Sequence, residues 1–237
     1  MRRPQFVRFT ELDGAHVNRD FQIHTRLTDG EATIDDIVSH AEQLGLQEIA
    51  FTEHVRREST HFAEFATAVR QARQRTSLQV YLGVEAKALD DQGSLDAPPT
   101  ALGEVDLVLG SVHRFPVGSG EFMSAEAFEY AEAARRERTL ALALIRHAPI
   151  TVLAHPGGMC QRAFGTFPVD YLEELMQAAL ERGVAIEINT AYTRDLDGLL
   201  AVCRKMNPLV SIGSDVHRLG ELGTCRDALR ARGIGCR

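Results

Sequence analysis

The feature of the sequence that most restricts its fold is the regular alternation of short apolar strands with amphipathic helices over 237 residues. The apolar periodicity predicts seven strands, at 21–25, 48–52, 79–89, 105–112, 151–154, 184–188 and 209–212. It predicts helices at 33–44, 60–74, 124–147, 169–182, 196–206 and 225–232, with loops at 90–100 and 114–123. Alternation of this kind predicts a parallel sheet, either open or closed into a barrel.

Residues able to bind a metal or move a proton follow nearly every predicted strand. In chain order they are Gln22 and His24, Glu53 and His54, Glu85 and Lys87, His113, His155, Glu187 and Asn189, and Asp215 and His217. Catalytic groups of a βα barrel come from the carboxyl ends of its strands. The placement therefore favours a closed or nearly closed barrel over an open doubly wound sheet.

The spacing of these residues also indicates that they face the mouth of the barrel. Four of the groups are i, i+2 pairs, whose side chains point the same way in a strand. The pairs are Gln22/His24, Glu85/Lys87, Glu187/Asn189 and Asp215/His217. Histidine with carboxylates and no cysteine is a ligand set for Zn, Mn or Fe, and a carboxylate such as Glu85 can bridge two ions. The alternatives are a Lys87–Glu85 ion pair and a buried Glu187 paired with an arginine.

Composition excludes several classes of protein. The formal charge of −7 disfavours a broad nucleic-acid surface, and no glycine-rich nucleotide loop is present. The longest apolar run, 140–145, is too short to span a bilayer, so no membrane partner is expected. The four cysteines form no C-x-x-C pair, which is typical of reduced thiols in a cytoplasmic protein. The oligomeric state is left open.

An ordered set of motifs resembles one known family. The motifs are DFQIHTRLTDG, FTEH, GVEAK, GSVH, AHPGG, EINT and GSDVH, spread over about residues 20–220. They resemble the PHP family, named for polymerase and histidinol phosphatase. The resemblance implies a single domain over 1–237, a distorted TIM-like (β/α)7 barrel with a cluster of two or three metal ions.

The same resemblance implies which residues would bind each of the metal ions. His24, Glu85 and Asp215 would hold one ion, Glu85 would bridge to a second ion held by His113 and His155, and His54 and His217 would hold a third. Three positions depart from the family pattern: Gln22 replaces a histidine, Glu53 replaces an aspartate, and Gly30 stands where some members carry a further histidine. Gln22 is therefore expected to ligate weakly or to leave a water in its place.

The implied activity is that of a metal-dependent phosphatase. We expect a phosphomonoesterase that hydrolyses a small phosphorylated metabolite, in the manner of histidinol phosphatases, by metal-activated water. Catalytic roles are assigned to Glu85, Asp215 and His217, and substrate contacts to Arg56, Lys87, Arg114, Arg162, Glu187 and Asn189. The alternatives are a phosphodiesterase or nuclease with the same cluster, and a degenerate, non-catalytic metal-binding barrel. Exposed arginines with no site role are the alternative for Arg56, Arg114 and Arg162.

Overall fold

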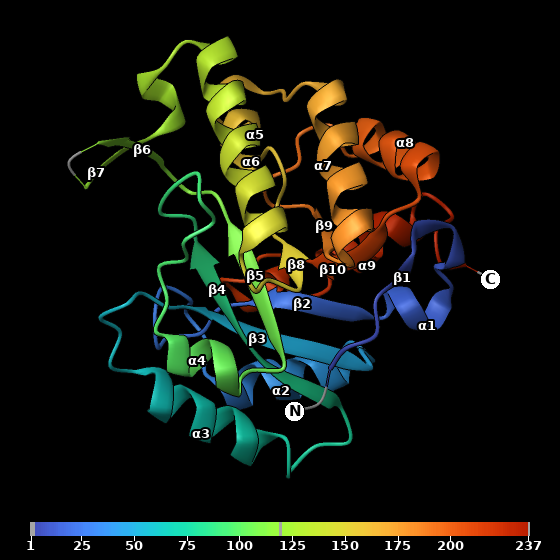
Figure 1. The fold of residues 1–237 in the computed structure, drawn as a ribbon. Coiled ribbons are helices and arrows are strands. Elements are labelled where there is room, and N and C mark those ends of the chain that lie inside the picture. The colour runs from blue at the N-terminus through green and yellow to red at the C-terminus, as the bar shows by residue number, and fades with distance from the viewer. Residues whose placement is uncertain (1–2, 119, 237) are drawn as a thin grey trace.

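A computed structural model describes residues 3–118 and 120–236 of the chain. Seven strands of its main sheet run parallel, in the order β2-β3-β4-β5-β8-β9-β10, and a short β1 pairs antiparallel with β10. The strands are β1 Val7–Arg8, β2 Arg19–Ile23, β3 Glu48–His54, β4 Gln79–Lys87, β5 Leu107–Ser111, β8 Val152–Leu153, β9 Ala185–Asn189 and β10 Leu209–Gly213. A separate antiparallel hairpin, β6 Phe115–Gly118 and β7 Glu121–Met123, projects from the body of the molecule (Figure 1).

The sheet curls until its two outer parallel strands meet at their carboxyl ends. Ile23 forms a parallel bridge with Val216, beyond the end of β10. The His24 amide donates to the Val216 carbonyl (2.8 Å), and the Val216 amide donates to the Gln22 carbonyl (3.0 Å). The predicted distorted barrel of seven βα units is confirmed, with closure made by this bridge and not by a continuous ladder.

Helices cover the outside of the barrel in two groups. In Figure 1, α2, α3 and α4 lie on one side of the sheet, and α5, α7 and α8 lie on the other. The helices are α1 Gly14–Val17, α2 Ile34–Gln43, α3 Phe62–Ala72, α4 Pro99–Glu104, α5 Tyr130–His147, α6 Gly158–Phe164, α7 Val169–Arg182, α8 Leu196–Met206 and α9 Thr224–Arg230. Three short 3-10 turns are η1 Phe9–Glu11, η2 Ala125–Ala127 and η3 Leu219–Glu221.

Local sequence signals place several helix ends correctly. Thr33 caps α2: its hydroxyl accepts from the Asp36 amide (3.0 Å), and the Asp36 carboxylate accepts from the Thr33 amide (3.2 Å). Helices α7 and α8 have the predicted bounds, and both end at a residue with positive φ, Gly183 and Asn207. These helix ends can be predicted because each cap depends only on residues that are close in the sequence.

Three local predictions are wrong. The helix predicted at 124–147 begins at Tyr130, because Phe128 is extended (φ −124°, ψ 158°) and separates α5 from η2. The predicted loops contain the start of α4 and the β6–β7 hairpin. Helix α6 was not predicted, because it begins after Gly157 (φ 75°), which has no side chain to signal a cap.

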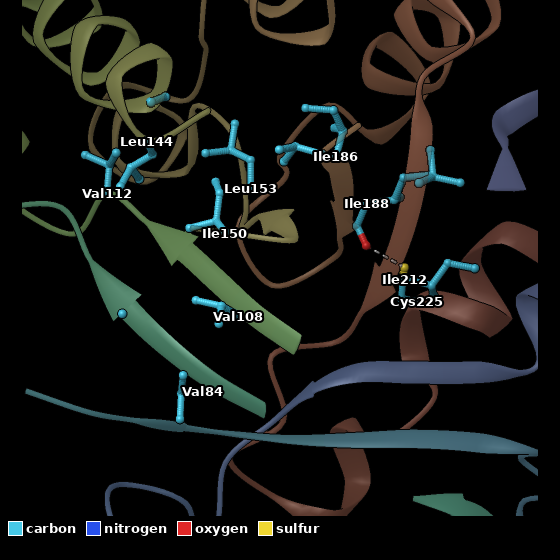
Figure 2. Packing of buried hydrophobic residues seen from close by; sticks show 14 of the residues in the cluster. Val84, Val108, Val112, Leu144, Ile150, Leu153, Ile186, Ile188, Ile212 and Cys225 are labelled. Atoms are coloured by element: carbon cyan, nitrogen blue, oxygen red, sulfur yellow. Dashed lines mark hydrogen bonds between the residues drawn. The ribbon is translucent and has the colours of Figure 1, made fainter. Parts of the chain in front are cut away.

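Apolar side chains form two cores, one on each face of the barrel strands. The larger core lies between strands and helices; Figure 2 shows part of it, including Val108, Ile150, Leu153, Ile186 and Ile212. The buried members of the smaller core are Phe21, Ala50, Tyr81, Leu107, Leu109, Val152, Ala154 and Ala185. It occupies the other face of the same strands, which is the barrel interior. No helix in the described part of the chain is long and apolar enough to cross a membrane.

Candidate metal centre

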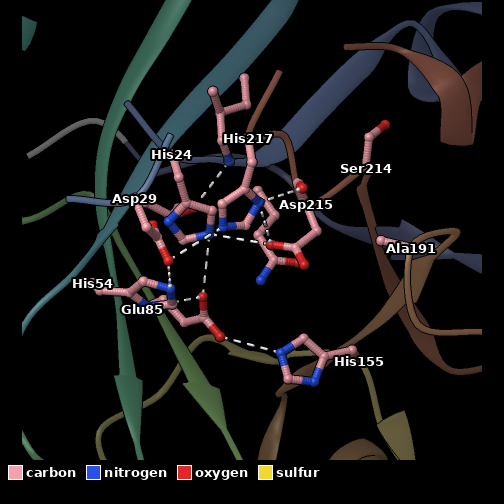
Figure 3. A network of polar contacts seen from close by, with 12 residues as sticks. His24, Asp29, His54, Glu85, His155, Ala191, Ser214, Asp215 and His217 are labelled. Atoms are coloured by element: carbon pink, nitrogen blue, oxygen red, sulfur yellow. Dashed lines mark hydrogen bonds and ion pairs between the residues drawn. The ribbon is translucent and has the colours of Figure 1, made fainter. Parts of the chain in front are cut away.

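The ends of the parallel strands bring five histidines and two acids into one cluster. Figure 3 shows His24, His54 and His217 gathered beside Glu85 and Asp215, with His155 on the opposite side of Glu85. His54 ends β3 and Glu85 lies near the end of β4, while the others lie in the loops that directly follow β2, β5, β8 and β10. The barrel therefore brings together side chains that are up to 193 residues apart in the sequence, since His24 and His217 stack at 4.7 Å.

Glu85 lies at the centre of the cluster, and the residue is 2% exposed. Its Oε1 is 3.0 Å from His113 Nε2 and 3.1 Å from His155 Nε2. Its Oε2 is 3.3 Å from His24 Nε2 and 3.4 Å from His54 Nδ1. Each carboxylate oxygen thus faces a different pair of imidazoles, which is the arrangement that a carboxylate bridging two cations requires.

Asp215 completes the inner part of the cluster. Its Oδ1 lies 3.2 Å from His24 Nε2 and 3.9 Å from His217 Nδ1. The His217 Nδ1 lies closer, at 3.0 Å, to the Asp215 carbonyl oxygen. Asp215 itself has left-handed backbone geometry (φ 53°), which is uncommon for a residue other than glycine. Strain at a residue that faces the cluster is typical of a functional site.

The charges of the cluster shift the pKa values of its members in both directions. Burial opposes a charge on His24, but Asp215 and Glu85 outweigh it and hold the pKa of this imidazole well above its ordinary value. Burial disfavours a charged Glu85, but His113 and His54 outweigh it and hold the pKa of this carboxyl well below its ordinary value. Burial lowers the pKa of His113. Burial also opposes a charge on His155, but the hydrogen bond that His155 donates to the Glu85 carboxylate raises the pKa of His155 to about 9. An ionised carboxylate and a neutral imidazole are competent ligands, whereas His24 and His155 must each lose a proton when an ion binds.

Buried polar atoms without a hydrogen bond provide the test of whether these residues fit a metal. Both ring nitrogens of His24 and the Oε2 atom of Glu85 are buried and make no hydrogen bond of ordinary geometry within the described chain. Three groups have ligand atoms within 4.8 Å of one another: His24, Glu85 and Asp215; His54, Glu85 and His113; and His24, Asp29, His54 and His217. Buried donors and acceptors of this kind are costly unless something else satisfies them. The donor set suits divalent ions.

Asp29 is a member of the cluster that sequence reasoning missed. Its Oδ2 lies 3.3 Å from His54 Nε2 and 3.4 Å from His217 Nε2, and His54 is the main reason that its pKa is lowered. The signal was present in the Asp29-Gly30 turn that follows β2, but a side chain in a turn has no strand parity that fixes its direction. Gly30 cannot carry a side chain here, because a Cβ would lie 2.5 Å from the His24 carbonyl oxygen.

Two polar residues near the cluster are engaged elsewhere. Gln22 is fully buried, and its Oε1, the amide atom able to bind a metal, accepts a hydrogen bond from Asn189 Nδ2 (2.6 Å). Glu53 is also buried and accepts from the Thr25 amide (2.7 Å) and from the Thr28 hydroxyl. Glu53 therefore fixes the loop between His24 and Asp29.

The cluster opens into a cavity of about 1010 Å³. One of the residues predicted to contact the substrate lines this cavity, and the others do not. Arg162 lines the cavity, together with Tyr192, Arg194 and Arg218, which the sequence did not indicate. The other predicted substrate contacts are not among the residues that line the cavity. Arg56 and Arg114 are exposed, and Glu187 and Asn189 are buried. Lys87 forms an ion pair with Asp96 (3.4 Å) rather than with Glu85. Among the described residues no arginine pairs with Glu187.

Comparisons with known proteins agree on one family. A family model described as the PHP domain matches residues 20–191. The chain is 27% identical over 223 residues to a protein from Caldanaerobacter subterraneus named "Probable phosphatase TTE1963", covering 89% of this chain and 80% of that one. It is 28% identical over 203 residues to a "Probable phosphatase" from Caldicellulosiruptor saccharolyticus, covering 81% and 77%. A solved structure of a "putative histidinol phosphatase" from Listeria monocytogenes has the same fold, with TM-score 0.73, 15% identity and coverage of 86% and 97%.

Proposed function

The chain belongs to the PHP domain family and is a metal-dependent phosphatase, and from this premise we propose that it hydrolyses phosphomonoesters of small metabolites. The observation that carries the proposal is the pairing of Glu85 with four histidines at the floor of an open cavity. Histidinol phosphate is one candidate substrate. The curated relatives named as phosphatases support the reaction class, and the size of the cavity suits a small organic group.

Three sets of residues would hold divalent ions. His24, Glu85 and Asp215 form one, Glu85, His113 and His155 form a second, and His54 and His217 with Asp29 form a third. Bound Zn, Mn or Fe would neutralise phosphoryl oxygens and lower the pKa of a water molecule, which is the chemistry that phosphate hydrolysis needs. Hydrolysis by this site would need two bound ions, and the third set of residues could hold one more. Gln22 is not needed as a ligand, because its oxygen faces Asn189.

The remaining residues orient the substrate and handle protons. Arg162 and Arg194 line the cavity, and neither makes an ion pair with an acid among the described residues, so both guanidinium groups can bind phosphoryl oxygens as forks. Arg218 is held by Glu31 (3.1 Å) and is less available. Asp215 and His217 border the same cavity, and we assign to them the transfer of the proton that the attacking water loses and the leaving alkoxide takes up.

A panel of phosphomonoesters, including histidinol phosphate and p-nitrophenyl phosphate, tests the proposal in the presence of Mn²⁺, Zn²⁺ or Fe²⁺. Bis-p-nitrophenyl phosphate is assayed beside it. The expected result is phosphate release from at least one monoester and slow turnover of the diester. The variant His113→Ala should lose this activity, whereas His147→Ala, an exposed histidine at the end of α5, should keep it. Turnover of the diester alone would indicate a phosphodiesterase, and no turnover with any ion would indicate a degenerate site.

A further inference from the structure

Tyr192 joins two parts of the cavity wall. It lies in the loop after β9, and its ring stacks on the His155 imidazole with centroids 4.2 Å apart and planes at 20°. Arg162 Nη1 donates to the Tyr192 hydroxyl (3.1 Å), and the Arg162 guanidinium carbon lies 5.0 Å from the ring centroid. One aromatic side chain therefore contacts both a candidate metal ligand and a candidate phosphate-binding arginine.

Asn189, at the end of β9, fixes the loop that carries Tyr192. Its Oδ1 accepts from the amides of Ala191 (2.9 Å) and Tyr192 (3.1 Å). Its Nδ2 donates to Gln22 Oε1 (2.6 Å) and Glu187 Oε2 (3.2 Å). These four bonds use every donor and acceptor that an asparagine side chain has. Asn189 is also fully buried, so it has no capacity left to bind substrate.

Glu187 holds the other member of the stack. Its Oε2 accepts from the His155 amide (2.7 Å) as well as from Asn189. His155 has positive φ (29°), a conformation that a residue other than glycine adopts only when its surroundings impose it. The buried pair Glu187–Asn189 thus holds the backbone amides of both stacked residues, His155 and Tyr192, and sets the distance between their rings.

Gly158 lies directly against both rings of the stack. A Cβ at this position would lie 2.9 Å from Tyr192 Cδ1 and 3.1 Å from His155 Nδ1. A side chain there would have to push one of the rings aside, since contacts under 3.0 Å do not occur in real structures. Gly158 therefore leaves room for the stack.

We propose that Tyr192 is a positioning residue for the metal ligand His155, held on it by the buried Glu187–Asn189 pair, and that its hydroxyl aims Arg162 at the substrate. The proposal rests on the proposed function, because it takes His155 as a ligand. The ring restricts the rotation of the imidazole and keeps Nε2 directed at Glu85 (3.1 Å). Neighbours that orient a ligating histidine typically change metal affinity by about 10- to 100-fold when they are removed.

The test compares Tyr192→Ala with Tyr192→Phe in the full chain, by titrating Mn²⁺ and Zn²⁺ against a competing chelator without substrate. Loss of the ring should weaken the affinity for at least one ion by about tenfold or more. Tyr192→Phe keeps the ring, so its metal affinity should stay within about twofold of the wild type, while KM for a phosphomonoester rises several-fold because Arg162 loses its hydroxyl partner. Tyr171→Ala, a half-buried aromatic on α7, is the matched control for loss of a ring.

Several outcomes would overturn the inference. Unchanged metal affinity in Tyr192→Ala would do so, as would equal losses in the Ala and Phe variants, because the ring would then not be the cause. If Tyr192→Ala fails to fold, Gly158→Ala carries the test: it should weaken metal binding by forcing the rings apart, and unchanged affinity would contradict the proposal. A wild-type chain that binds no ion would overturn the proposed function itself, which separates the two failures.

Discussion

The two ends of the barrel differ in how fully their buried charged groups are hydrogen-bonded. At the amino end, the buried Arg19 pairs with Glu48 (2.9 Å) and donates to the Gln5 carbonyl (2.8 Å), and the Tyr81 hydroxyl donates to Glu48 (2.8 Å). At the carboxyl end, His24 and Glu85 are as deeply buried, yet three of their polar atoms make no hydrogen bond of ordinary geometry within the described residues. The amino end is therefore called the paired end, because its charged groups are hydrogen-bonded apart from the Arg19 Nε atom. The carboxyl end is called the unpaired end, because these atoms of His24 and Glu85 have at most ion-pair contacts, at 3.2 to 3.4 Å.

The difference shows which end stabilises the fold and which end is adapted for binding. A charge paired inside the protein repays part of its desolvation, whereas a buried donor or acceptor without a partner is a cost that folding alone does not recover. The carboxyl end therefore retains a cost that a bound cation can offset. Variants at the two ends should affect different measurements.

The largest effect is expected at the centre of the unpaired end. Glu85→Gln removes a carboxylate that faces four histidines, and it should lower phosphatase turnover by about a thousandfold, equivalent to about 4 kcal/mol of transition-state stabilisation. Steady-state assays with saturating Mn²⁺ measure this loss. Glu58→Gln, an exposed acid, is the control. A variant with more than a tenth of wild-type turnover would show that Glu85 does not bridge ions.

At the paired end, Glu48→Ala leaves Arg19 as a buried charge without its carboxylate. Loss of one partner of such a pair should lower the free energy of unfolding by about 3 kcal/mol, since Glu48 is partly exposed. Urea denaturation measures this change. Metal affinity should stay at the wild-type level, and a parallel loss of metal binding would mean that the two ends are not independent.

Metal ions should stabilise the carboxyl end. An ion at a hundred times its Kd should add about 2.7 kcal/mol, which raises the unfolding temperature of a chain of this size by roughly 5 to 10 °C. Thermal unfolding with added Mn²⁺ and with excess EDTA measures the shift. The Glu48→Ala variant should show the same increase from a lower starting temperature. No increase in the wild type would argue against a cluster that holds ions.

The smallest effect concerns a buried acid outside the cluster. Glu137 on α5 accepts from the amides of Met159 (3.0 Å) and Cys160 (2.8 Å), and burial raises its pKa above the ordinary value of 4.5. Because the folded state then holds this proton more tightly, its contribution is fully present below pH 4.5 and is lost as the pH rises through the raised pKa.

Unfolding of the wild type and of Glu137→Gln at a series of pH values checks this sign. The stability of the wild type relative to the variant should fall with rising pH, by about 1.4 kcal/mol for each unit by which the pKa is raised. A relative stability that increases with pH would show that the ionised form is the one that the fold prefers. Chelator should not change the difference, since Glu137 is not in the metal cluster.

Much of the site was predictable because its residues lie at strand ends. Strand periodicity fixed the order of the βα units, and the parity of β4 directed Glu85 into the barrel with its histidine neighbours. Parity did not decide what each side chain contacts. Lys87 has the same parity as Glu85, yet as the last residue of β4 it pairs with Asp96 and contacts the Phe122 ring.

The sequence by itself determined the class of fold, the family and the group of residues at the carboxyl end, because these follow from local periodicity and from residue types at strand ends. Only the tertiary structure decided which side chains line the cavity. Asp29, Tyr192 and Arg194 enter through loops, whose directions depend on contacts with other parts of the chain, such as the hydrogen bond that the Arg194 amide donates to Gln161 Oε1, 33 residues away. It also turned the Gln22 oxygen toward Asn189, 167 residues away. Such contacts form only when the barrel closes, so no pattern along the chain specifies them.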